Sequence, residues 1–158
     1  MFPVLAPIFH WADTSWLSLE IRASTWQFAI LEMVHLLGLT ALLGALMVLD
    51  LRLFGFGMRK QPVSQLAKDL TAWTWIGLVT ILSSGVLLFF GEPMKLFGSP
   101  SFHLKMLLLF LAIVFQFTLF RKVTMNDTAS PGLDKVAGVL SLFLWFGVGL
   151  AGRAIGFL

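Results

Sequence analysis

The stretch that decides the fold of this protein is residues 26–50, WQFAILEMVHLLGLTALLGALMVLD. It is almost entirely apolar, since Glu32, His35 and Asp50 are its only ionisable side chains. An α-helix rises 1.5 Å per residue, so roughly 20 apolar residues cross the hydrocarbon core of a bilayer, which is about 30 Å thick. Comparable apolar stretches lie at residues 70–90, 101–120 and 132–156. The sequence therefore predicts four membrane-spanning helices.

The composition supports the same class of protein. Of the 158 residues, 58% are apolar and only 12% are charged, whereas a soluble domain carries about 25% charged residues. A disordered chain needs few large apolar residues and many charges, so it is excluded as well. The length is that of one domain, and we expect residues 1–158 to form a single unit in a lipid bilayer.

The charge and the cysteine content narrow the partners and cofactors. The net charge is +3, and the basic residues are scattered between apolar segments. Because a phosphate backbone binds a continuous basic surface, nucleic acid is not expected as a partner. The absence of cysteine excludes disulfides, thiolate-bound metals and iron–sulfur clusters, so any metal must be bound by His, Met, Asp or Glu.

Helix-start signals precede the predicted spans. Ser24 and Gln27 have the spacing of a capping box, and Gly91 is a natural end for the second span. Prolines typical of a first helical turn open the other spans: Pro62, Pro100 and Pro131. The connections are short, which makes consecutive spans antiparallel and predicts an all-α, up-down-up-down four-helix bundle.

Basic residues indicate the orientation in the membrane. Residues 11–22, WADTSWLSLEIR, mix tryptophans with charged side chains and predict a short interfacial helix. Seven of the eleven Lys and Arg residues follow spans one and three, an end that the positive-inside rule assigns to the cytoplasm: Arg52, Arg59, Lys60, Lys68, Arg121, Lys122 and Lys135. Both termini are therefore expected outside the cytoplasm.

A series of motifs covers most of the chain. They are His35-Leu36-Leu37-Gly38, Asp50-Leu51-Arg52-Leu53, Lys105, Ser141 with Trp145, and Gly152-Arg153. This series resembles a family of small, uncharacterised bacterial inner-membrane proteins with four helices. The resemblance implies the fold and the inner membrane, without a reaction. More distantly, the layout is similar to small haem-associated bundles such as the copper-resistance D type and the His-bearing membrane protoporphyrinogen oxidases.

Ionisable groups inside spans are costly, and they usually face the bundle interior or mark a functional path. The candidates are Glu32, His35, His103, Lys105 and Arg153. His35 and His103 are both expected in the outer half, where two facing imidazoles are the usual axial ligands of haem b. Counted from the helix starts, His35 lies about 11 Å deeper than His103, so the geometry permits a shared haem without requiring it.

The charged neighbours fit the same hypothesis. Lys105 and Arg153 are placed to pair with haem propionates, and Glu32 is three residues from His35, on the same helix face, where it would orient the imidazole. We therefore expect a haem-b protein that transfers electrons near the outer face, with His35 and His103 as metal ligands. We also expect His35, Lys105 or Arg153 to be a partner of Glu32, directly or through water.

Two other functions remain open. In one, the chain is a cofactor-free accessory or assembly subunit, and His35 is a structural hydrogen-bond donor to Glu32 or to a carbonyl. In the other, it is a small transport subunit that moves a metal ion or proton along Glu32, His35 and Lys105.

A copper site is a further alternative to haem. Met33 and Met106 accompany the two histidines, and a thioether together with an imidazole suits copper(I).

Two further features concern contacts between helices. Asp50 and Arg52 lie two apart and do not face each other on a helix, so we expect them to bond to the starts of spans two or four. Small residues on span four, Gly149, Gly152 and Gly156, allow close helix approach. That approach would serve either the bundle itself or other membrane subunits, including a second copy of the chain.

Overall fold

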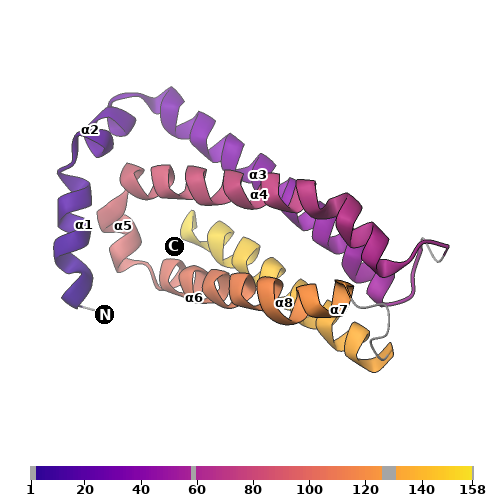
Figure 1. Ribbon diagram of the computed structural model, residues 1–158. Helices are drawn as coiled ribbons and strands as arrows, with labels where there is room; N and C mark the ends of the chain where they lie inside the picture. Colours follow the sequence, from indigo (N-terminus) through magenta and orange to yellow (C-terminus); the bar gives the residue numbers. More distant parts are fainter. Residues whose placement is uncertain (1–2, 58–59, 126–130, 158) are drawn as a thin grey trace.

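The computed structural model describes residues 3–57, 60–125 and 131–157, which form helices and turns and no strand. Four runs are long and apolar enough to cross a membrane: α3 (Thr25–Leu53), α4 (Val63–Gly91), the run Pro100–Met125 and α8 (Pro131–Ile155). Figure 1 shows two antiparallel pairs, α3 with α4 and the third span with α8. The prediction of an all-α bundle with four spans is confirmed.

Two of the helices extend beyond the membrane spans predicted within them. α4 begins at Val63 rather than at residue 70, because Pro62 adopts the extended backbone of an N-cap and the polar first turns bury Leu66 and Ala67. The third span continues to Met125 rather than ending at residue 120. It consists of α6 (Pro100–Phe115), a π-helical turn (Gln116–Phe120) and α7 (Arg121–Met125).

The helix ends follow local chemistry in most places. Ser99 caps α6, since its hydroxyl accepts a hydrogen bond from the Phe102 backbone N–H. Ser24 is the N-cap residue of α3, but its side chain makes no capping hydrogen bond, so the predicted capping box is wrong. α4 ends at Gly91 as predicted, and the Phe28 ring lies where a Cβ at Gly91 would be. Ser130, which precedes Pro131 at the start of the fourth predicted span, falls outside the described residues.

The segment predicted as one interfacial helix lies in two helices. α1 (Ala6–Asp13) and α2 (Trp16–Ala23) are separated at Thr14 and Ser15, and the Ser15 hydroxyl caps α2 by accepting from the Ser18 N–H. A short 3₁₀ helix, Pro3–Leu5, lies ahead of α1. Arg22 ties α2 to the end of α4 by donating from Nε to the Gly91 carbonyl at 2.8 Å, and it also pairs with Asp13.

The hydrophobic core lies in the half of the bundle that contains α7. Its largest members are Leu42 and Leu46 of α3, Phe120 in the π-helical turn and Trp145 of α8, each at most 1% exposed. The other half contains α5 (Pro93–Gly98), which joins α4 to α6. The two helix pairs lie farther apart at this α5 end than at the α7 end (Figure 1). The candidate site lies in that wider half.

Candidate functional site

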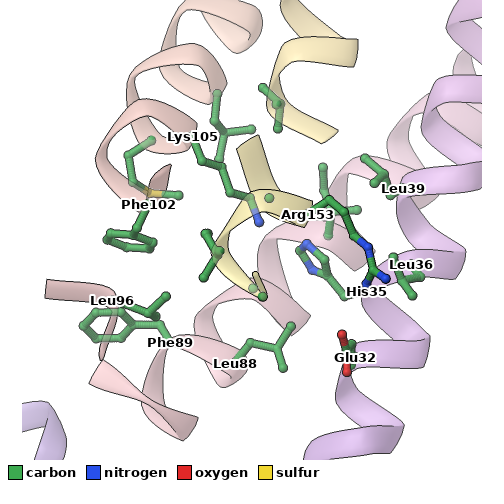
Figure 2. A pocket seen from close by; sticks show the side chains of 18 of the residues that line it. Glu32, His35, Leu36, Leu39, Leu88, Phe89, Leu96, Phe102, Lys105 and Arg153 are labelled. Carbon is green, nitrogen blue, oxygen red and sulfur yellow. The ribbon is translucent and has the colours of Figure 1, made fainter. Parts of the chain in front are cut away.

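A cavity of about 470 Å³ lies between the two helix pairs at the α5 end. All four spans and α5 contribute to its wall, which is mostly aliphatic and aromatic (Figure 2). The polar side chains in the wall are Glu32, His35, Glu92, Lys95, Lys105 and Arg153. Glu92 and Lys95 are exposed and form an ion pair of 3.1 Å between Oε2 and Nζ. The structure therefore brings four of the five predicted site residues to one cavity.

The imidazole of His35 is oriented by α4. Its Nδ1 lies 2.9 Å from the Ser84 hydroxyl oxygen. The Ser84 hydroxyl hydrogen is already donated to the Thr80 carbonyl, so Ser84 accepts from His35 and Nδ1 carries the proton. In this tautomer, Nε2 keeps its lone pair. Ser84 is 3% exposed and was not among the residues expected from the sequence, because a serine in an apolar helix carries no distinctive pattern.

Close approach around the imidazole depends on glycine. A Cβ at Gly85 would be 3.4 Å from Cε1 of His35. Across the cavity, a Cβ at Gly152 of α8 would be 3.2 Å from the Lys105 Nζ. Backbone rather than side chain therefore forms the wall next to both groups.

Lys105 reaches from α6 towards His35 across the cavity (Figure 2). Its amino group makes no hydrogen bond or ion pair with any residue that the structure describes. Arg153 approaches from α8, and its guanidinium carbon lies 4.8 Å from the centre of the Phe157 ring. Two cationic groups thus border an apolar cavity without a carboxylate partner within the described ranges.

Glu32 lies one turn before His35 in α3, and it is exposed. No direct ion pair or hydrogen bond joins it to another described residue, so the direct pairing expected with His35, Lys105 or Arg153 is not found. The expected role of Glu32 as the acceptor that orients His35 belongs to Ser84 instead. Glu32 keeps a place in the cavity wall, on the side of His35 and Arg153 (Figure 2).

His103 is not in the cavity wall. Its Nδ1 lies 2.8 Å from the Ser99 carbonyl oxygen, one turn back in α6, and its ring stands edge-on to Phe102. The structure therefore does not bring the two predicted histidine ligands to one cavity. Met106, which we considered as a copper ligand, does line the cavity, whereas Met33 is exposed and does not.

Metal-binding groups are sparse overall. Over residues 3–57, 60–125 and 131–157, no three His, Asp or Glu side chains come close enough together to hold a metal ion. A metal bound only by such side chains would therefore lack ligands in this part of the chain.

The α7 end contains a second group of polar contacts. The Ser141 hydroxyl of α8 donates to Asp50 Oδ2 at 3.0 Å, and Asp50 is 1% exposed. Arg52 donates to the Gln61 carbonyl, just before α4. The expectation that Asp50 and Arg52 bond to other elements is confirmed, although Asp50 contacts α8 ten residues into the helix rather than at its start.

The small residues of α8 face the cavity. Gly149, Gly152 and Gly156 all line it. They therefore serve the interior of the bundle, and an association of two chains through α8 would have to use its outward, apolar face.

Comparison with protein families gives one match. The model of a family described only as being of unknown function, DUF6644, matches residues 8–158. The chain belongs to that family. DUF6644 membership agrees with the expected uncharacterised family, and it names no reaction or cofactor. No curated protein and no solved structure matches the chain significantly, so the more distant resemblance to haem-associated bundles stays an expectation.

Proposed function

We propose that this protein binds haem b in the cavity at the α5 end, where His35 would hold its iron, and transfers electrons there. The observation that carries the proposal is the tautomer of the His35 imidazole. Nδ1 of His35 carries the proton and donates a hydrogen bond to the Ser84 hydroxyl, so Nε2 presents its lone pair beside a mostly apolar cavity. A metal-binding histidine is typically fixed in this way by a hydrogen bond at its other nitrogen.

The donor set suits a haem better than a bare metal ion. A porphyrin supplies the equatorial ligands of its iron, so one protein imidazole is enough to hold it. A bare ion would need several protein ligands, which the described residues do not bring together. When bound, the haem would supply one-electron chemistry.

The cavity has suitable size and charge for such a ligand. Its volume of about 470 Å³ lies within the range of about 300–1,000 Å³ typical of small-molecule and cofactor sites. Arg153 would pair with a propionate of the ligand, and the Lys105 amino group would add a second positive charge to the same cavity. The residues present therefore fit the group.

We place the protein in a bacterial inner membrane with the α5 end, and so the haem site, outside the cytoplasm. The distribution of basic residues supports this orientation, because seven of the eleven belong to the α7 end or its connections. Electron donor and acceptor would then meet the protein near the outer surface.

The test is an absorbance spectrum of the protein purified from haem-replete membranes. We expect a sharp Soret band, with resolved α and β bands on reduction, that is lost in His35→Ala. His10→Ala is the matched control, since His10 lies exposed on α1 and outside the cavity wall. A folded wild-type protein that stays colourless with ample haem would refute the proposal.

A colourless protein would favour the cofactor-free accessory subunit. One observation supports that second candidate: only 6% of the most apolar window of the third span is buried, compared with 28–33% in the other spans. That span therefore offers the largest apolar face to lipid or to a partner subunit. Transport through the chain is less well supported, because Leu42, Leu46 and Trp145 close the bundle at the α7 end.

A further inference from the structure

We infer that the proposed haem site leaves one side open for a small anionic ligand, held by the amino group of Lys105. This inference rests on the proposed function and goes beyond it, because it names a second class of ligand for the same cavity and the residue that would hold it.

The first step concerns the number of imidazoles. His35 is the single histidine among the described residues that line the cavity. His103 directs Nδ1 to the Ser99 carbonyl of its own helix and lies outside the cavity wall. A ligand bound by His35 therefore has no second imidazole facing it from these residues.

The second step concerns what faces His35 instead. Lys105 extends from α6 over Gly152, whose missing side chain gives Nζ its space. Nζ has no hydrogen-bond or ion-pair partner within the described part of the chain, and the Lys105 side chain points towards His35 (Figure 2). A cation in an apolar cavity without a partner favours an anionic or hydrogen-bond-accepting ligand.

The third step concerns the remaining donor atom. Met106 also lines the cavity, and its thioether is a known axial ligand of haem iron. Met106 is 40% exposed, however, so its side chain is only partly committed to the cavity. The experiment must therefore distinguish an open position from one that Met106 or His103 fills.

The experiment uses the full-length, haem-loaded protein in detergent with two probes, carbon monoxide on the reduced form and azide on the oxidised form. We expect both probes to change the absorbance spectrum. In Lys105→Leu, azide affinity should fall about tenfold or more, because a charge-assisted hydrogen bond is lost, while the affinity for uncharged carbon monoxide changes little. The control is Lys135→Leu, which removes the same charge at an exposed position near the start of α8 and should leave azide binding unchanged.

Three outcomes would overturn the inference and leave the haem proposal standing. In the first, the spectrum of the haem-loaded protein responds to neither probe. In the second, it responds only after Met106→Leu or His103→Ala. In the third, azide affinity is the same in Lys105→Leu as in the wild type. A protein that takes up no haem instead refutes the proposed function. If Lys105→Leu does not accumulate in the membrane, Lys105→Gln serves in its place, with a smaller loss of azide affinity expected because the amide still donates.

Discussion

Ser84 illustrates how one buried hydroxyl sets the chemistry of a residue on another helix. It donates to the Thr80 carbonyl of its own helix and accepts from His35 of α3. The first bond decides the direction of the second, and the second decides which imidazole nitrogen is left to bind a ligand. Asp50 and Ser141 form a comparable contact between α3 and α8 at the other end of the bundle.

We predict that Ser84→Ala weakens haem binding about 10–100-fold, the usual cost of removing a hydrogen bond that orients a metal ligand. Haem titration followed by absorbance measures the change. Ser83→Ala is the control, since Ser83 is exposed and its hydroxyl bonds to carbonyls within α4. Equal affinities in the wild type and Ser84→Ala would show that Ser84 does not orient the ligand.

At the scale of helices, the α3–α4 pair depends on glycines at its crossing. A Cβ at Gly77 would be 2.7 Å from the Leu42 backbone nitrogen, and one at Gly38 would be 2.7 Å from Cγ2 of Thr80. Without a side chain at these positions, the two backbones approach closely, as is common for helices packed in membranes. The crossing holds α4, and with it Ser84, against the face of α3 that carries His35.

We predict that Gly77→Ala destabilises the bundle by about 1–3 kcal/mol, because the new methyl group meets backbone that cannot move aside. Thermal unfolding in detergent should give a midpoint lower by a few degrees for each kcal/mol lost. The control is Gly44→Ala, because nothing lies within 4 Å of a Cβ at Gly44. An unchanged midpoint for Gly77→Ala would mean that the helices separate there at no cost.

For the whole molecule, the two ends of the bundle differ in packing and in charge. The α7 end holds the core and most of the basic residues, whereas the α5 end holds the cavity and is covered on one side by α1 and α2. Phe9 of α1 fixes this cover, since its ring centre lies 5.0 Å from that of Phe97 in α5 and 5.1 Å from that of Phe89 in α4. The packed core therefore separates a site in the wider half from the α7 end, and α1 and α2 cover the α5 end on one side.

We predict that reporter fusions after Lys60 and after Gly98 lie on opposite sides of the membrane, with the first in the cytoplasm. The basic residues near Lys60 favour the cytoplasmic side, and Gly98 ends α5 at the opposite end of α4. A reporter enzyme active only in the cytoplasm and one active only outside give the readout. Both fusions on one side would contradict the four-span topology.

The sequence by itself determined the membrane class, the four spans and the elements that carry Glu32, His35, Lys105 and Arg153. Those features depend on local composition and on helix length, which act within each segment. Pro62 indicated where α4 begins, but the polar first turns lower the local hydropathy, so the predicted membrane span covers only residues 70–90. The break between α1 and α2 was missed because tryptophans and charged residues lie on both sides of it.

Only the tertiary structure decided which of these residues meet. The rotation of each helix about its axis and the register between helices determine whether a side chain enters the cavity, and neither quantity is encoded in one segment. For this reason Ser84 rather than Glu32 orients His35, and Lys105 rather than His103 faces it. The same reason explains the place of Gly152 in α8, where the missing side chain leaves room for Lys105 inside the bundle.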